Sequence, residues 1–168
     1  MVLFGSNPGV QEWALERQGL PSIKVAVQGQ REVVTTNFQA VRDYAAKMEL
    51  TMPDGKDYFE WQKEVLDSIN TEDHLKVFHS VGGIFHKHLL DPGMVLFVPF
   101  GFFVKERILG TTTALGYRAS ALDPTPENIA TFEEMHAQHR IALGPSAEEN
   151  VLVKFWTEVI SVFKTGKA

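Results

Sequence analysis

Residues 91–106, DPGMVLFVPFGFFVKE, hold the clearest fold signal in the chain. The stretch opens with a turn at 91–93, where Pro presets φ and Gly accepts a positive φ. Residues 94–98 are all apolar, which predicts a short strand buried on both faces. Pro99-x-Gly101 turns the chain again. The next strand alternates, so one face carries Phe102, Val104, Glu106 and Ile108.

Further strands are predicted on either side of this stretch. Residues 23–36 read as a hairpin that turns at Gln28-Gly29-Gln30. Between residues 75 and 122 one short apolar run follows another, separated by Gly and Pro turns. Spacing this close is typical of an antiparallel meander or of a jelly roll.

Helices are predicted from caps and apolar stripes. A short helix is expected around 8–18, another behind a capping box of Thr36 and Gln39, and a third from Asp57. Near the C-terminus, Thr125-Pro126 opens a helix that Gly144 closes, and Ser146 with Glu149 caps the last helix. That last helix has the strongest stripe in the chain: Leu152, Phe155, Trp156, Val159, Ile160 and Phe163.

These elements predict a single α+β domain over residues 1–168. Its parts are a helical and hairpin N-terminal region (1–70), an antiparallel β meander (75–122) and two C-terminal helices (126–164).

Composition narrows the function classes. Hydrophobic residues make up 44% of the chain and charged residues 22%, as in ordinary soluble globular proteins. The net charge of −5, without a Lys/Arg cluster, argues against nucleic-acid binding. No apolar run reaches the roughly 18 residues that membrane insertion requires. The chain lacks cysteine, and its N-terminal stretch does not resemble a signal peptide, so a cytoplasmic location is expected.

The spacing Gly93–x5–Pro99–x–Gly101 resembles the second sequence motif of the cupins. More loosely, it resembles the region before the last metal-binding His of JmjC-type oxygenases. The resemblance implies a cupin-like double-stranded β-helix (jelly roll), complete or partial, with N-terminal helices and two C-terminal helices packed on it.

The polar members of that motif are replaced in this chain. Cupins continue with a metal-binding His, and the equivalent residue here is Val104; the family's Asn corresponds to Ile108. His86-Lys87-His88 lies too close to Gly93 to be the family's first motif, and residues 23–36 contain no His. We therefore expect the metal ligands to be lost and no cofactor to be bound. The alternative is Fe or another divalent metal at a non-standard site.

Three residues are candidates for that alternative site. His86 and His88 lie two apart on a strand, which suits chelation, and Glu106 is a possible third ligand. If Glu106 points inward, it is a buried carboxylate suited to acid–base catalysis. The favoured interpretation is instead that Glu106 reaches solvent or pairs with Arg118.

The leading hypothesis is a non-catalytic cupin-like binding or scaffold module, so the chain is expected not to be an enzyme. Its candidate binding residues are Val104, Phe102, Phe155, Trp156 and Phe163. One alternative is a cupin-type metal-dependent oxygenase or isomerase. The other is a structural subunit of a larger assembly, with a protein partner or a second copy covering the sheet edge or the last helix.

Overall fold

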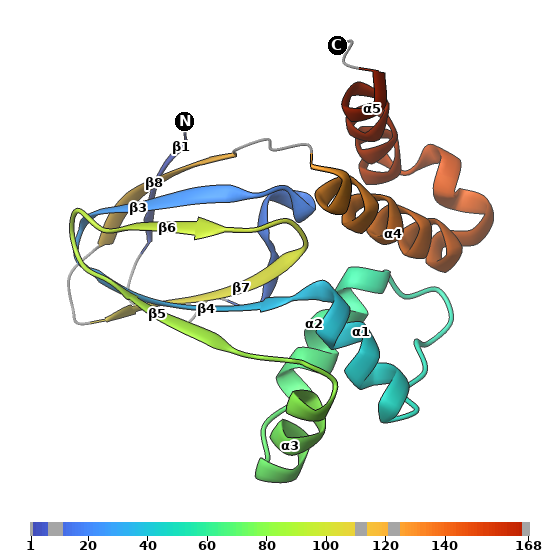
Figure 1. The fold of residues 1–168 in the computed structure, drawn as a ribbon, viewed down its shortest axis with the longest axis horizontal. Helices are drawn as coiled ribbons and strands as arrows, with labels where there is room; N and C mark the ends of the chain where they lie inside the picture. The colour runs from blue at the N-terminus through green and yellow to red at the C-terminus, as the bar shows by residue number, and fades with distance from the viewer. Residues whose placement is uncertain (1, 7–11, 110–113, 121–124, 166–168) are drawn as a thin grey trace.

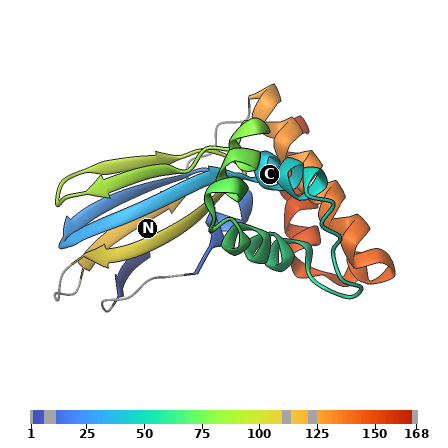
Figure 2. The same ribbon diagram turned by 90° about the horizontal axis from the view of Figure 1, so that it is seen from below.

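The protein is an α+β structure; the computed structural model describes residues 2–6, 12–109, 114–120 and 125–165. Its strands are β1 (Val2–Ser6), β2 (Ala14–Leu15), β3 (Ser22–Gln28), β4 (Gln30–Asn37), β5 (His86–Leu90), β6 (Val95–Val98), β7 (Phe102–Leu109) and β8 (Ala114–Ser120). Its helices are η1 (Glu16–Gly19), α1 (Phe38–Lys47), α2 (Tyr58–Ser68), α3 (Glu72–Ser80), α4 (Pro126–Leu143), η2 (Gly144–Glu149) and α5 (Val151–Thr165). The helices α1 to α5 gather at one end of the strands (Figures 1 and 2).

The strands form two four-stranded antiparallel sheets. One sheet, which we call sheet A, has the order β1-β8-β3-β6, and the other, sheet B, has the order β2-β7-β4-β5. Every connection between successive strands changes sheet, except the one from β4 to β5. The predicted meander over 75–122 is therefore wrong. The predicted hairpin over 23–36 turns at Gly29, which has φ +72°, but its two strands lie in different sheets.

An apolar core fills the space between the two sheets. Its buried residues come from five strands: Ala26, Val33, Leu90, Val98 and Val104. The predicted alternation of β7 is confirmed, and the face that carries Val104, Glu106 and Ile108 is the inward one, because all three side chains are buried. The prediction that β6 is buried on both faces is wrong. This strand lies at the edge of sheet A, where Val95 and Phe97 are 62% and 53% exposed.

Two segments predicted from pattern adopt another structure. Residues 76–81 were expected to form a strand, but 76–80 belong to α3 and Val81 is the residue at its C-terminal cap. The Thr71 hydroxyl accepts a hydrogen bond from the His74 amide (3.2 Å), and acidic residues fill the first turn of that helix. The described part of the helix expected at 8–18 forms β2 and η1 instead, while residues 7–11 lie outside the described residues.

The helix starts follow the cap rules, with two shifts in position. Asp57 caps α2 as predicted, and Thr125 caps α4, which ends at Gly144. The cap of α1 is Asn37 rather than Thr36, and α5 is capped by Asn150 rather than by Ser146. In both helices the side-chain oxygen of an Asn accepts hydrogen bonds from the backbone amides of the first turn. That Asn lies one residue after the predicted cap of α1 and four residues after the predicted cap of α5.

A second, larger core joins the helices to sheet B and to the ends of the strands. Phe38, Phe59, Phe132 and Trp156 are buried in it, and their rings meet edge-on or tilted. His139 of α4 is buried among the same rings. Burial lowers the pKa of the His139 imidazole, outweighing the nearby Asp57 carboxylate, which acts to raise it.

The Pro99-x-Gly101 turn connects the two cores. Gly101 has φ +65°; its amide donates to the Gly19 carbonyl (3.0 Å), and its carbonyl accepts from the Phe38 amide (2.7 Å). A Cβ at this position would lie 3.1 Å from Thr131 Cγ2 and 3.2 Å from Met135 Sδ, both on α4. The turn therefore brings the apolar stretch into contact with the end of η1, the start of α1 and the side of α4 at Gly101.

Candidate functional site

A cluster of charged side chains lies inside the sandwich, where the apolar core would otherwise continue. Lys24 of β3, Arg31 of β4 and Glu106 of β7 occupy inward positions on three strands, and Glu16 reaches them from η1. All four side chains are less than one-tenth exposed. The antiparallel registers place them beside the apolar inter-sheet core.

The Lys24 ammonium is the centre of this cluster. Its Nζ lies 2.8 Å from Glu16 Oε2 and 2.5 Å from Glu106 Oε1. The second oxygen of Glu106 lies 3.5 Å from an Arg31 guanidinium nitrogen, and the Ser22 hydroxyl donates to Glu16 Oε1 (2.9 Å). Two cations thus face two carboxylates, so the four charges balance. A buried carboxylate without such partners would be strongly unfavourable.

The favoured interpretation of Glu106 from sequence is therefore corrected. The carboxylate does not reach solvent, and the side chain of Arg118, its predicted partner, lies outside what the structure describes. It is buried and paired with Lys24 and Arg31, because β3 and β4 place both cations on the inward face. Since both carboxylate oxygens have a cation partner, the geometry is that of a structural ion pair.

The arrangement does not fit the metal centre that the cupin resemblance would imply. Val104 occupies the motif's ligand position and packs in the apolar core. The next inward residue of β7 is Glu106, and the space beside its carboxylate is filled by the Lys24 ammonium. Within the described parts of the chain, no group of three or more His, Asp or Glu side chains is placed to hold a metal ion.

His86 and His88 lie away from Glu106. Both belong to β5, the edge strand of sheet B, and β4 separates that strand from β7. Two strand spacings amount to roughly 10 Å. His86 is exposed and His88 half-buried, with ring centroids 6.4 Å apart. Burial, followed by repulsion from His86, lowers the pKa of His88.

The aromatic residues proposed for partner binding lie in different surroundings. Trp156 is fully buried between Phe59 and Phe132, and Phe163 packs against Phe100 and Phe132. Phe155 is half-buried against the same core. The stripe of α5 thus packs largely on the protein's own helices.

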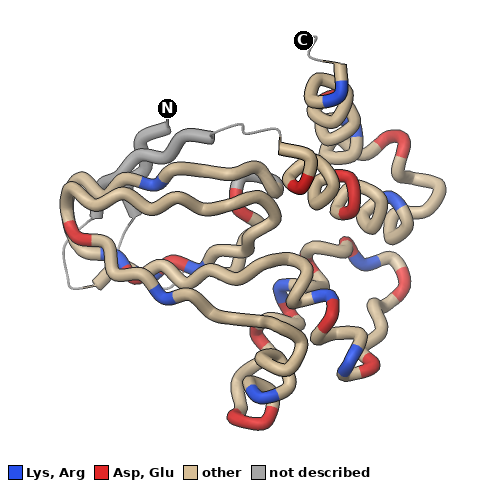
Figure 3. Tube along the Cα trace, in the orientation of Figure 1, with Lys and Arg blue, Asp and Glu red and all other residues tan. Residues whose placement is uncertain are grey.

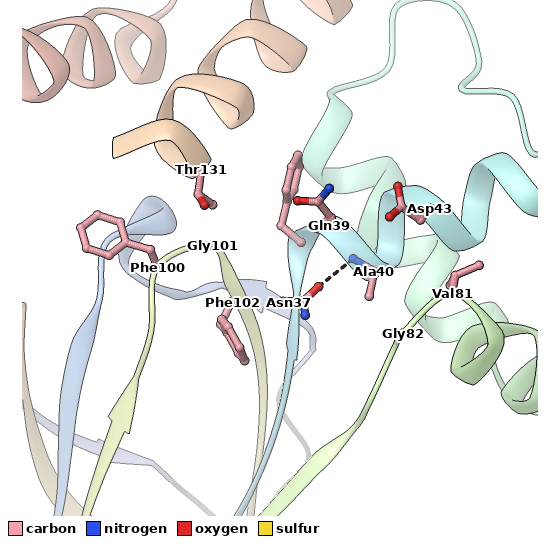
Figure 4. A pocket seen from close by; sticks show the side chains of 11 residues that line it. Asn37, Gln39, Ala40, Asp43, Val81, Gly82, Phe100, Gly101, Phe102 and Thr131 are labelled. Carbon is pink, nitrogen blue, oxygen red and sulfur yellow. Dashed lines mark hydrogen bonds between the residues drawn. The ribbon is translucent and has the colours of Figure 1, made fainter. Parts of the chain in front are cut away.

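A pocket of about 330 Å³ opens at the end of the sandwich that the helices surround. Phe102 and Gly101 of the β6–β7 turn, Asn37 and Gln39 at the start of α1, and Thr131 of α4 line it (Figure 4). The Asn37 side-chain oxygen accepts a hydrogen bond from the Ala40 backbone amide (2.7 Å). Asp43 stands at the same rim, already paired with Arg42 (2.9 Å). The pocket therefore combines an aromatic surface with amide and hydroxyl groups.

The sequence did not reveal Lys24, Arg31 or Glu16 as part of a site. In the run IKVAV (23–27), alternation assigns the three apolar residues Ile23, Val25 and Val27 to the core and Lys24 to solvent. In the structure β3 presents its two faces the other way round: the Lys24 side chain is buried, and the Val27 side chain is 52% exposed. The cluster could have been predicted from charge balance: a Glu106 carboxylate that faces inward needs a buried cation, and Lys24 supplies it.

Comparisons with protein-family models and with curated proteins found no match to this sequence. Among the described residues, no helix has the length and apolar character needed to cross a membrane.

Proposed function

We propose that this protein is a non-catalytic binding module built on a double-stranded β-helix whose interior is closed by ion pairs. Two points support the fold assignment. The eight strands among the described residues divide into two four-stranded antiparallel sheets, and successive strands change sheet at all but one connection. This is the arrangement expected of a jelly roll.

The observation that carries the proposal is the position of the Lys24 ammonium. It lies between the carboxylates of Glu16 and Glu106, inside the sandwich, and Glu106 is the next inward residue of β7 after Val104. A divalent cation would have to displace this ammonium, and the displaced charge would then have no partner. The cost of such a rearrangement disfavours metal binding at this place.

The binding site of the module is, in this proposal, the pocket at the helical end. Its volume lies within the range of small-molecule sites, and Phe102 supplies an apolar surface. The Gln39 side chain, the Asn37 side-chain nitrogen and the accepting oxygen of Thr131 supply hydrogen-bonding groups. The Asn37 oxygen, the Thr131 O–H and the nearby Asp43 are already engaged by Ala40, Glu127 and Arg42. This chemistry suits a small, uncharged molecule that has one apolar face and one hydrogen-bonding face.

Metal retention tests the non-catalytic part of the proposal. The purified protein would be incubated with Fe²⁺, Mn²⁺, Zn²⁺ or Ni²⁺, desalted and measured by elemental mass spectrometry. We expect no stoichiometric metal, and the same result for the His86→Ala/His88→Ala variant. A stoichiometric metal that the double variant loses would support the enzyme alternative and reject our proposal.

Fragment screening by ¹H–¹⁵N NMR tests the location of the binding site. We expect the shifts to cluster at the amides of 37–40 and 101–102 around the pocket. Shifts centred on Lys24 and Glu106 would instead mean that the interior opens to ligands, which the ion pairs should prevent.

A further inference from the structure

A fully buried histidine lies where the helices α2, α4 and α5 meet. The ring of His139, on α4, packs on Phe59 of α2 and on Trp156 of α5, with ring centroids 5.0 and 5.5 Å away. We call this contact of three rings the three-helix junction. A buried imidazolium needs a partner that compensates its charge, because an uncompensated charge in an apolar core is strongly unfavourable. The polar neighbours of His139 therefore decide how the junction responds to pH.

The polar neighbours of the imidazole are two helix caps. Nε2 of His139 lies 3.7 Å from Asp57 Oδ2, which is too long for a hydrogen bond. The other carboxylate oxygen of Asp57 accepts from the first amides of α2, and the Asn150 side-chain oxygen accepts from the first amides of α5. A proton on His139 would therefore have to be compensated by groups that already hold the starts of two helices.

Burial outweighs the groups that favour a charged ring. The Asp57 carboxylate and the Asn150 side chain act to raise the pKa of His139, whereas His136, one turn earlier on α4, acts to lower it. Burial has the largest effect, so the pKa of His139 lies below its ordinary value of 6.5. At neutral pH the ring is neutral, and the junction is an uncharged contact.

His136 is the second imidazole that α4 presents to α5. Its Nε2 lies 3.2 Å from the Thr157 hydroxyl, and its ring centroid lies 6.4 Å from that of Trp156. Burial and Arg140 lower its pKa, and Glu148 of η2 acts to raise it. Figure 3 shows both acidic and basic residues along α4 and its connection to α5. Because His136 is only half-buried, its ring can take up a proton without leaving its place.

The helix α5 is the element that can separate at this junction. It packs mainly on α4 and η2, and its buried side chains are Val153 and Trp156. Trp156 covers the His139 ring from this side. Separation of α5 would bring the imidazole into water, whereas the sandwich has its own core between the sheets.

We propose that His139 is an acid-sensitive switch, which holds α5 on α4 while the imidazole is neutral and releases α5 when the imidazole takes up a proton. In the opened form the ring meets water and binds a proton at its ordinary pKa of 6.5, whereas the closed form binds it only at lower pH. The contact therefore has its full strength above pH 6.5 and weakens as the pH falls through this value.

The switch also affects the pocket at the helical end. Thr131 lies on the same helix as His139 and forms part of the pocket wall. A change in how α4 is held at its C-terminal half therefore changes the support of that wall. The inference about His139 does not depend on what the pocket binds.

Hydrogen exchange of the whole chain, followed by ¹H–¹⁵N NMR, tests the switch. Protection factors, which correct for the intrinsic effect of pH on exchange, would be compared at about pH 7.5 and pH 5.5. We expect the amides of α5 to lose up to about tenfold in protection, the factor for one proton bound by the opened form. The amides of β7, inside the sandwich, should keep theirs. His139→Gln and His139→Phe cannot titrate, and their α5 amides should show no such loss.

The matched control is His136→Gln, which removes another imidazole of α4 that contacts Trp156 and should keep the loss of protection. Three results would overturn the proposal: α5 amides that stay protected at the lower pH, β7 amides that lose as much as those of α5, or a loss that both His139 variants retain. Circular dichroism at neutral pH would establish that each variant is folded. The comparison of α5 with β7 in the wild type needs no variant.

Discussion

At the scale of single residues, Lys24 determines what the interior of the sandwich can do. Its ammonium joins the carboxylates of Glu16 and Glu106, and all three groups are nearly without contact with water. A buried ion pair of this kind often adds little stability compared with an apolar replacement of the whole set. Removing one partner has a much larger effect, because the remaining charges stay buried without compensation.

We predict that Lys24→Met lowers the free energy of unfolding by about 3–5 kcal/mol, since two carboxylates then remain near a single guanidinium. Urea denaturation at neutral pH measures the change. The matched control is Lys76→Met: Lys76 is largely exposed, pairs only with Glu72 and Asp73 on the surface of α3, and should contribute at most about 1 kcal/mol. Equal effects of the two substitutions would show that the Lys24 cluster is not structural.

At the scale of elements, the β6–β7 turn explains why an apolar run contains Pro99 and Gly101. The turn must allow α4 to approach and must also give Gly101 a positive φ, and only glycine satisfies both conditions without strain. Gly93 has a positive φ as well, but a Cβ there would meet open space.

We predict that Gly101→Ala destabilises the protein more than Gly93→Ala. Both variants carry the cost of a left-handed residue, about 1–2 kcal/mol. Gly101→Ala adds the close contacts with Thr131 and Met135, which should contribute a further 1–3 kcal/mol or so. Thermal and urea unfolding of the two variants would give the difference, and equal losses would mean that α4 moves away without resistance.

The sequence predicted some elements well because their signals are local. The alternation of β7, the Asp57 cap of α2 and the Thr125–Gly144 limits of α4 each depend on neighbouring residues, and the structure confirms them. The orientation of β3 could not be predicted in this way. Lys24 faces inward because of Glu106, which is 82 residues away. Likewise, the strand predicted at 76–81 lies almost entirely in α3, because the Thr71 cap favours a helix over the apolar alternation.

At the scale of the whole molecule, two apolar cores share the strands β4 and β7. Val33 of β4 belongs to the inter-sheet core, and its neighbour Val34 packs against the core with the helices. Phe103 of β7 points into the core with the helices, and its neighbour Val104 points into the inter-sheet core. The three tryptophans, Trp13, Trp61 and Trp156, all belong to or pack against the helical core. Tryptophan fluorescence therefore reports on one core only.

We predict that Val104→Ala shifts the tryptophan fluorescence transition although no tryptophan lies in its core, because β7 makes the two cores unfold together. The free energy of unfolding should fall by about 2 kcal/mol. Val151→Ala, at an exposed position on α5, is the control and should change it by less than about 0.5 kcal/mol. An unchanged tryptophan transition in Val104→Ala would mean that the cores unfold independently.

The ion pair between Lys24 and Glu106 also has a kinetic consequence. It connects two strands that are 82 residues apart in the chain, and Arg31 reaches Glu106 across 75 residues. Most of the chain must be collapsed before these charges can meet, so they lose their water late in folding. Topologies dominated by such distant contacts fold slowly, within milliseconds to seconds. During that time the apolar strands of the inter-sheet core have not yet paired, and a newly synthesised chain is then most exposed to aggregation.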